Sequence, residues 1–146
     1  MPRDQVISVS RVIDAPAGTI FDLLADPSQH PVLDGSGTVR QYRGEPQRLT
    51  LGATFGMKMH FVVPYRIKNT VVEFEEGRLI AWRHFGGHRW RFELQPEEAG
   101  TRVTESFDWS TAVSPKFIEL AGYPRRHAPE MERTLERLAA EVETPA

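Results

Sequence analysis

The residue of this sequence best suited to acid–base chemistry is Glu105, in the stretch "TRVTESFDWS". Alternate side chains of an extended strand share one face, so Glu105 should lie beside Val103 and Phe107 on an apolar face. Loss of hydration there would raise its pKa and suit it to general acid or base catalysis. The alternatives are a structural carboxylate paired with an arginine and a strand bulge that turns it to water. A structural role is favoured, because buried carboxylates are usually paired.

His84 and His88 form the second candidate group, because a three-residue loop between them would place them opposite each other in a hairpin. Two imidazoles could polarise a carbonyl, transfer a proton or share a metal ion. A metal site needs a third ligand, and only Asn69 or His127 offers one. We therefore expect packing or hydrogen bonding, with no metal and no cofactor, and retain both histidines as tentative catalytic residues.

The stretch "HRWRFEL" interleaves arginines with rings, a pattern that could form a nucleic-acid platform. Its period of two instead puts Trp90 and Phe92 on one face of a strand and Arg89, Arg91 and Glu93 on the other. The second face carries mixed charge, which predicts solvated strand surface. Eighteen Lys and Arg against twenty Asp and Glu give a formal charge of -2, so we expect no nucleic-acid partner.

The elements that must position these residues follow from the apolar period. Period-two segments separated by short glycine-containing turns predict antiparallel strands at residues 5–14, 38–45, 50–62, 65–75, 78–85, 88–95 and 101–110. Helical spacing and breakers predict helices or turns at residues 17–26, 27–34, 114–123 and 129–143. The last helix carries one apolar stripe, made of Met131, Leu135, Leu138 and Val142. The apolar sheet face, which includes the alternating residues Leu51 to Phe61, should pack against this stripe.

The hairpin loops also predict which side chains meet on the inner face. A three-residue loop at 85–87 and a four-residue loop at 97–100 fix the register of the three strands that they join. The expected pairs are His84 with His88, Trp82 with Trp90, Ile80 with Phe92, Trp90 with Phe107, Phe92 with Glu105, and His88 with Trp109.

Length and composition set the broad class. A chain of 146 residues can bury a core as one domain without disulfides, and residues 1–146 are expected to form one. The chain has no cysteine, which excludes thiolate chemistry. No apolar run is long enough for a signal peptide or a membrane span, so we expect a cytoplasmic protein without stable membrane insertion.

The order of these segments is familiar. A strand followed by "DAPAGTIFDLLADP", then "HPVLDGSGTV", the strands of "VVEFEEGRLIAWRHFGGHRWRFEL" and "GTRVTESFDWS", and a long closing helix resembles the polyketide cyclase/dehydrase-like branch of the START-related (SRPBCC) superfamily. The resemblance spans essentially the whole chain. It implies an α+β helix-grip fold, in which a curved seven-stranded antiparallel sheet wraps around the C-terminal helix, with two short helices after the first strand.

The resemblance also implies an internal cavity, whose lining must carry any chemistry. The expected ligand-binding residues are Met57, Met59, Phe61, Trp82, Trp90, Phe92, Phe107, Trp109, Tyr123 and His127. The same side chains could fill a solid core, and the sequence leaves both arrangements open. His30 and Asp34 should border the cavity entrance, with Asp34 bonding to its own turn.

These features favour binding of a hydrophobic small molecule, lipid-like or polycyclic, by a monomer or homodimer. The alternative is a cyclase or dehydratase in which Glu105 or a histidine exchanges a proton next to a carbonyl group. A regulatory module that binds a protein partner is a third possibility.

Overall fold

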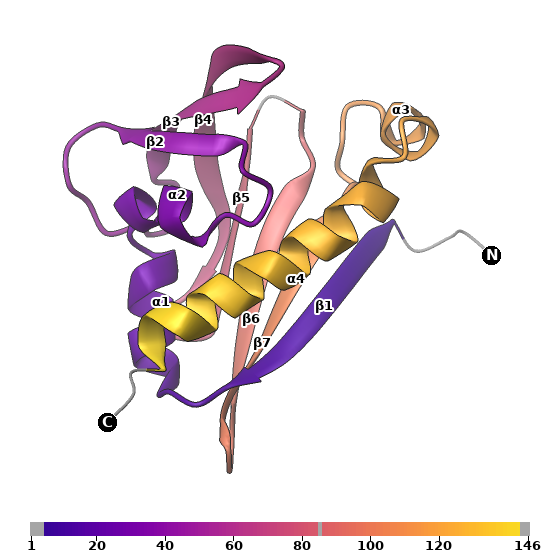
Figure 1. Ribbon diagram of the computed structural model, residues 1–146. Coiled ribbons are helices and arrows are strands. Elements are labelled where there is room, and N and C mark those ends of the chain that lie inside the picture. The colour runs from indigo at the N-terminus through magenta and orange to yellow at the C-terminus, as the bar shows by residue number, and fades with distance from the viewer. Residues whose placement is uncertain (1–4, 85, 144–146) are drawn as a thin grey trace.

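The computed structural model describes residues 5–84 and 86–143, which form one antiparallel sheet crossed by a long helix (Figure 1). The sheet order is β1-β7-β6-β5-β4-β3-β2. The strands are β1 (Val6–Ile13), β2 (Val39–Arg43), β3 (Thr54–Phe61), β4 (Val63–Glu75), β5 (Leu79–Arg83), β6 (Arg89–Glu97) and β7 (Gly100–Asp108). The helices are α1 (Ala17–Leu24), the 3-10 turn η1 (Pro27–Gln29), α2 (His30–Leu33), α3 (Pro115–Leu120) and α4 (Tyr123–Val142). The predicted seven-stranded helix-grip fold is confirmed.

The chain changes edges of the sheet only once, between β1 and β2. Every other pair of successive strands is joined as hydrogen-bonded neighbours, and β1 returns to pair with β7. The crossing uses α1, η1 and α2, which lie beside one half of the sheet, while α4 runs diagonally across the same face (Figure 1). None of the described helices is long and apolar enough to span a membrane.

The apolar stripe of α4 supplies one side of the core, as its spacing predicts. Met131, Leu135 and Leu138 are buried, and Val142 is half-buried. The helix packs mainly against β1 and β7. Helix α1 also contributes to the core, because Ile20, Phe21 and Leu24 face inward at helical spacing and are buried.

Four of the six predicted pairs of the central hairpins are confirmed, whereas the pairs of His88 with His84 and with Trp109 lie beyond the ends of the ladders. Ile80 pairs with Phe92, Trp82 with Trp90, Trp90 with Phe107, and Phe92 with Glu105. The β6–β7 loop is two residues long rather than four, since Glu97 also pairs with Gly100. The register survives this difference, because the extra pair extends the same ladder.

Several predicted boundaries are wrong for local reasons. The last helix begins at Tyr123, not at Pro129, because Pro129 is tolerated inside α4. The proline removes only the amide that would bond to the carbonyl of Arg125, a residue at the surface. Strand β3 begins at Thr54, so Leu51 lies outside it and is exposed.

The tip of the β3–β4 hairpin is tighter than predicted. Phe61 pairs directly with Val63, so that Val62 alone makes the turn. Val62 adopts a φ of 66°, a left-handed conformation that a β-branched residue rarely takes.

On the outer face of the sheet, the arginines of β6 are held in an ion-pair network. Arg91 Nε and Nη2 donate to the two carboxylate oxygens of Glu73 at 2.9 and 2.7 Å, and Nη2 also contacts Asp108 at 3.1 Å. Arg89 Nη1 donates to Glu73 at 2.8 Å. The side chain of Arg91 is only 17% exposed, so the expectation of simple solvated surface is wrong for these arginines, whereas Glu93 is exposed. The cause is Glu73 of β4, whose side chain reaches across β5 to meet both.

We expect Arg91→Gln to lower the free energy of unfolding by about 1.5–3 kcal/mol, because it leaves two half-buried carboxylates without their shared donor. Arg102→Gln is the matched control: Arg102 pairs with Glu97 at the surface, and its loss should change stability by less than about 1 kcal/mol. Urea unfolding of both variants measures the difference. Equal effects would show that the Arg91 network behaves as ordinary surface.

Candidate functional site

A cavity of about 610 Å³ lies between α4 and the concave face of the sheet. Strands β3 to β7 supply most of its walls, and the helices α2, α3 and α4 supply further lining residues. The end of α1, the start of β2, His84 and the loops at residues 34–38, 86–88 and 113–114 complete the lining. The interior is therefore hollow, which the sequence left open.

Nine of the ten side chains predicted to bind ligand line this cavity. They are Met57, Met59, Phe61, Trp82, Trp90, Phe92, Phe107, Tyr123 and His127. Four of the rings pack as neighbours across strands, with ring centroids 5.7 Å apart for Trp82 and Phe92 and 4.8 Å apart for Trp90 and Phe107. Such rings form a continuous apolar wall.

Trp109 is the exception, and its placement in the cavity lining was wrong. β7 ends at Asp108, where the amide of Ser110 turns back to bond the Asp108 carboxylate. Strand alternation therefore no longer sets the direction of the next side chain. Trp109 is buried in a second core cluster with Ile118 and Met131, and its Nε1 donates to Glu119 at 2.9 Å.

Glu105 faces the cavity from β7, opposite Phe92 of β6. It is 4% exposed, and its Oε1 has no hydrogen-bond partner among the described residues. Burial raises the pKa of its carboxyl well above the usual range, and the nearby Asp34 carboxylate adds to the rise. Neither an arginine partner nor an outward turn is found in the described chain, so both of these expected arrangements of Glu105 were wrong.

Asp34 behaves as its sequence context predicts. Its carboxylate accepts hydrogen bonds from the Ser36 hydroxyl at 2.7 Å and from the Val39 amide at 3.2 Å, within its own turn. The following Gly35 lies against α4, where its amide donates to Thr134 Oγ1 at 2.9 Å. A Cβ at Gly35 would stand 2.3 Å from the carbonyl oxygen of Glu130, so the turn requires glycine at this close approach.

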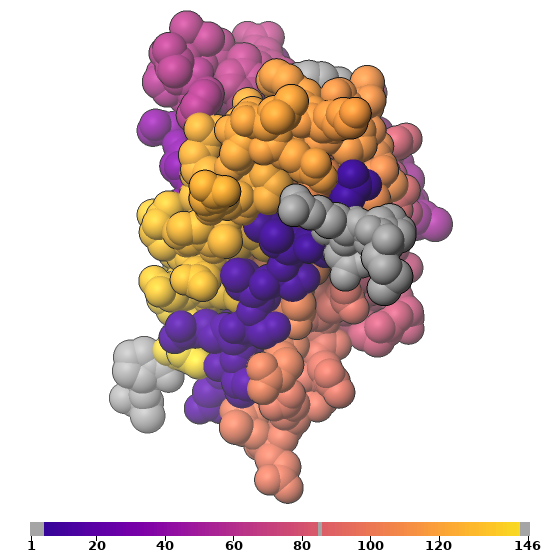
Figure 2. All heavy atoms as spheres, turned by 90° about the vertical axis from the view of Figure 1, so that its right-hand side faces the viewer, coloured from indigo at the N-terminus to yellow at the C-terminus, as the bar shows by residue number. Residues whose placement is uncertain are grey.

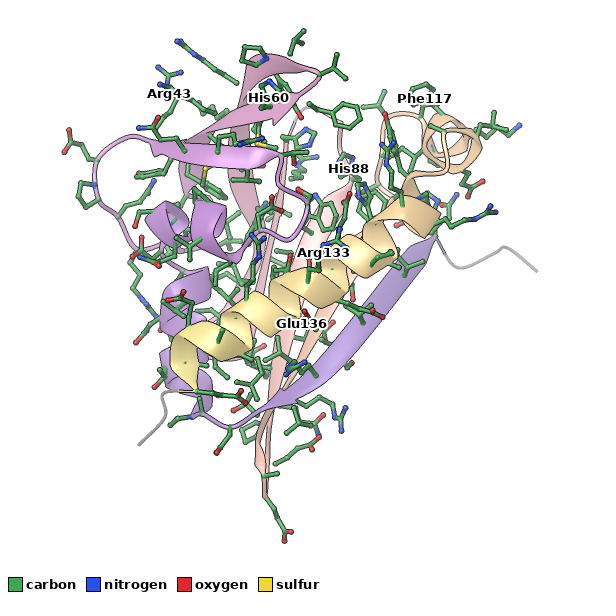
Figure 3. All side chains as sticks on the ribbon, viewed as in Figure 1. Arg43, His60, His88, Phe117, Arg133 and Glu136 are labelled. Atoms are coloured by element: carbon green, nitrogen blue, oxygen red, sulfur yellow. The ribbon has the colours of Figure 1, made fainter. Side chains whose placement is uncertain are left out.

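The predicted pair His84 and His88 lies near the open end of the cavity. Their ring centroids are 4.7 Å apart, and Figure 3 shows His88 toward the same end of the molecule as His60 and Phe117. Burial, with the neighbouring His84 and His127, lowers the pKa of His88 to about 4, and burial also lowers that of His84. Both rings are therefore neutral at pH 7. The described residues contain no group of three or more side chains arranged to hold a metal ion.

His127 joins this group from the first turns of α4. Its Nδ1 lies 3.0 Å from Glu130, and its ring contacts those of Trp90 and Phe107. His88 also contacts the Phe107 ring, so Phe107 is the shared surface on which the two histidines pack.

His30 is part of the cavity wall, a role that sequence reasoning assigned only to the entrance. Its ring stacks on Trp82 with centroids 4.6 Å apart, and its Nε2 donates to the carbonyl of Leu24 at 2.8 Å. Burial lowers its pKa to about 4. Thr134 was also missed, although its spacing between Met131 and Leu138 places it on the buried side of α4.

The mouth of the cavity lies between the β3–β4 hairpin and the start of α4. Phe61, Tyr65, Val113 and Phe117 line the cavity and are also exposed, which identifies them as the mouth. The guanidinium of Arg126 spans this opening, 5.3 Å from the ring of Phe61 and 4.9 Å from that of Tyr123.

The fold and the cavity together define an α+β helix-grip protein that encloses a largely apolar internal site. The chain belongs to the family described as polyketide cyclase / dehydrase and lipid transport, whose model matches residues 4–143.

Relatives and solved structures agree with this assignment. The chain is 40% identical over 139 residues to the uncharacterised protein Rv0088 of Mycobacterium tuberculosis, covering 91% of this chain and 62% of that protein. It is similar in fold to protein CV1439 of Chromobacterium violaceum, with a TM-score of 0.73, 18% identity and coverage of 96% and 99% of the two chains. The AHSA1-like protein of Aeromonas hydrophila gives a TM-score of 0.65, 19% identity and coverage of 94% and 92%. At these identities the solved structures support the fold alone.

Glu105 makes a prediction about stability and pH. The pKa of the Glu105 carboxyl is higher in the folded state than in the unfolded state. The free energy of unfolding is therefore greatest below the unfolded-state pKa and falls as the pH rises from there through the folded-state pKa. Glu105→Gln removes this loss, so the variant should be more stable than the parent at pH 7 by about 1 kcal/mol or more. The difference should disappear as the pH falls to about 4, near the pKa of an unperturbed Glu. Thermal unfolding across this pH range tests it, and a variant less stable than the parent at pH 7 would show that Glu105 is ionised and paired.

Proposed function

We propose that this protein binds a hydrophobic small molecule in its internal cavity. The observation that carries the proposal is the cavity itself, about 610 Å³ in volume and walled by aromatic rings and methionines. This volume lies within the range of sites that take small molecules and cofactors. An apolar ligand would replace water against these walls, which is the main favourable term in such binding.

The lining also indicates what the ligand looks like. Rings on adjacent strands offer flat faces for a polycyclic ligand, and the thioethers of Met57 and Met59 adapt to an alkyl chain. The buried polar side chains of the lining are those of His30, Asn69, Glu105 and Thr134, and the apolar residues outnumber them. The preferred ligand is therefore mainly apolar, lipid-like or polycyclic, with one or two polar substituents. The lipid transport in the family's description agrees with this choice.

Titration with the neutral fluorescent probe N-phenyl-1-naphthylamine should saturate near one site per chain, with competition by polycyclic aromatics or fatty acids. Met59→Glu should weaken binding by about tenfold or more, because the ligand would have to desolvate a carboxylate in the wall. Leu51→Glu is the control, since Leu51 is exposed and lies outside the cavity lining. Saturation at many sites, or equal effects of the two substitutions, would refute specific cavity binding.

A second function, acid–base catalysis in the same cavity, is supported by the unpaired carboxyl of Glu105. A carboxyl group with a raised pKa in an apolar site is suited to exchange a proton with a carbon next to a carbonyl group. The aromatic walls would hold the substrate in one orientation. His84 and His88 lie toward the mouth and remain candidates to hydrogen-bond a carbonyl oxygen there.

The bicyclic ketone 2-tetralone tests this second function, because its α-protons exchange with deuterated water at a rate that NMR measures. The folded protein should accelerate the exchange, and Glu105→Gln should reduce the acceleration by about 100-fold, the scale of general acid–base catalysis. Probe affinity should change little in the same variant. If the protein binds the ketone without accelerating the exchange, acid–base catalysis on this ketone is excluded and only the binding function is supported.

A further inference from the structure

Exposed apolar side chains gather at the mouth of the cavity. The described chain has nine large exposed hydrophobic residues, and seven of them belong to the two segments that flank this opening. We call these seven the rim: Phe61, Val62, Val63 and Tyr65 of the β3–β4 hairpin, and Val113, Phe117 and Leu120 in and beside α3. The hairpin and α3 lie together at one end of the molecule (Figure 2). Such a concentration marks an interaction surface rather than scattered surface apolarity.

The two halves of the rim present their apolar side chains outward. In α3, Ile118 points into the protein and is buried, whereas Phe117 and Leu120, three residues apart, share the exposed face. In the hairpin, Val62 is 84% exposed at the extreme tip.

The backbone conformation of Val62 also indicates that valine is not the residue that would make this turn most stable. Its φ of 66° is a conformation that glycine or asparagine adopts with less strain than a β-branched residue. A strained, exposed valine at this position suggests that an apolar side chain is needed there for another reason.

The two segments that carry the rim have a net positive charge although the whole chain is slightly acidic. Residues 58–68 contain Lys58, Arg66 and Lys68 and no acidic residue. Residues 113–126 contain Lys116, Arg125 and Arg126 against a single acid, Glu119. Lys58, Arg66 and Lys68 lie on the outer face of the hairpin, outside the cavity lining, whereas Arg126 spans the mouth. The formal charge of the whole chain is -2, so the two segments that carry the rim are more positive than the chain as a whole.

This charge decides between the possible occupants. A second copy docked symmetrically would bring two positive rims together, and like charges at an interface are unfavourable. A bilayer with anionic lipids offers the complementary combination: negative charge for the cations and an apolar layer beneath it for the rim. Two apolar projections on either side of an opening would also let a hydrophobic ligand pass between bilayer and cavity without crossing water.

We propose that the rim docks this protein on the surface of an anionic lipid bilayer, with Val62, Val63 and Leu120 below the headgroups and the cavity mouth facing the lipid. The docking is peripheral and reversible, because the apolar area is small. It goes beyond the proposed ligand binding, since Val62 and Leu120 do not line the cavity.

The test is co-sedimentation of the whole chain with vesicles of equimolar phosphatidylcholine and phosphatidylglycerol, and with vesicles of phosphatidylcholine alone. The parent should bind the mixed vesicles, more weakly as salt is added, and bind the neutral ones much less. Val62→Asn combined with Leu120→Asn should weaken partitioning by about tenfold or more, because apolar groups drive the insertion. The matched control is Leu51→Asn, at a site 65% exposed just before β3, at the end of that strand opposite to the tip. It should bind like the parent.

Two further measurements distinguish a loss of membrane docking from unfolding and from a loss of ligand binding. Val62→Asn should melt no lower than the parent, because asparagine tolerates the left-handed conformation, so lost vesicle binding cannot be ascribed to unfolding. Binding of N-phenyl-1-naphthylamine without vesicles should be unchanged in the double variant. Failure of the parent to bind this probe would refute the ligand-binding proposal but not the docking proposal. The docking proposal is overturned if the parent does not bind mixed vesicles, if the double variant binds them as tightly as the parent, or if the rim substitutions instead dissociate a dimer.

Discussion

A single helix cannot cover seven strands, and the rest of the structure follows from that limit. A helix with its side chains is about 10–12 Å wide, whereas seven strands spaced about 4.8 Å apart span roughly 30 Å. On the sheet, α4 packs mainly on β1 and β7, and the short helices α1 and α2 contact β6 and β2, so the helices cover the concave face of the remaining strands only in part. Large rings line this face, and a cavity of about 610 Å³ remains beside them. The hollow interior is therefore a consequence of the architecture, and its chemistry depends on which side chains face it.

Glu105 is the side chain for which that position matters most. An unpaired carboxyl in an apolar wall is normally unfavourable, because burial disfavours its ionised form. Its position in a largely apolar wall suggests that it interacts with what the cavity binds. The neutral ring of His88 packs on Phe107 and adds hydrogen-bonding capacity without adding charge. The cavity thus combines an apolar body with a few weakly solvated polar groups, a combination compatible with both carrying and converting a ligand.

The sequence predicts much of this arrangement, because the period of two in the strands and the turn residues between them are local signals. They place Trp82 opposite Trp90 and Glu105 opposite Phe92, and the helical period identifies the buried side of α4. What it misses depends on contacts between distant segments. Glu73 of β4 decides the surroundings of Arg91, the end of β7 decides the direction of Trp109, and the position of α4 decides whether the aromatic residues fill a core or line a space. Even the start of α4 depends on context, since proline is typical of the first turn of a helix, whereas Pro129 lies inside α4.

The pairing of β1 with β7 has a consequence for how the protein reaches this structure. The hydroxyls of Ser10 and Thr104 meet across that pair although 94 positions separate them along the chain. During synthesis, β1 has no partner until nearly the whole sheet has been made, and it must avoid pairing with other chains meanwhile. Closing so long a loop raises the contact order and slows folding relative to the local hairpins. Ser8, Ser10 and Arg11 interrupt the apolar residues of this strand, which limits its tendency to aggregate before β7 has been synthesised.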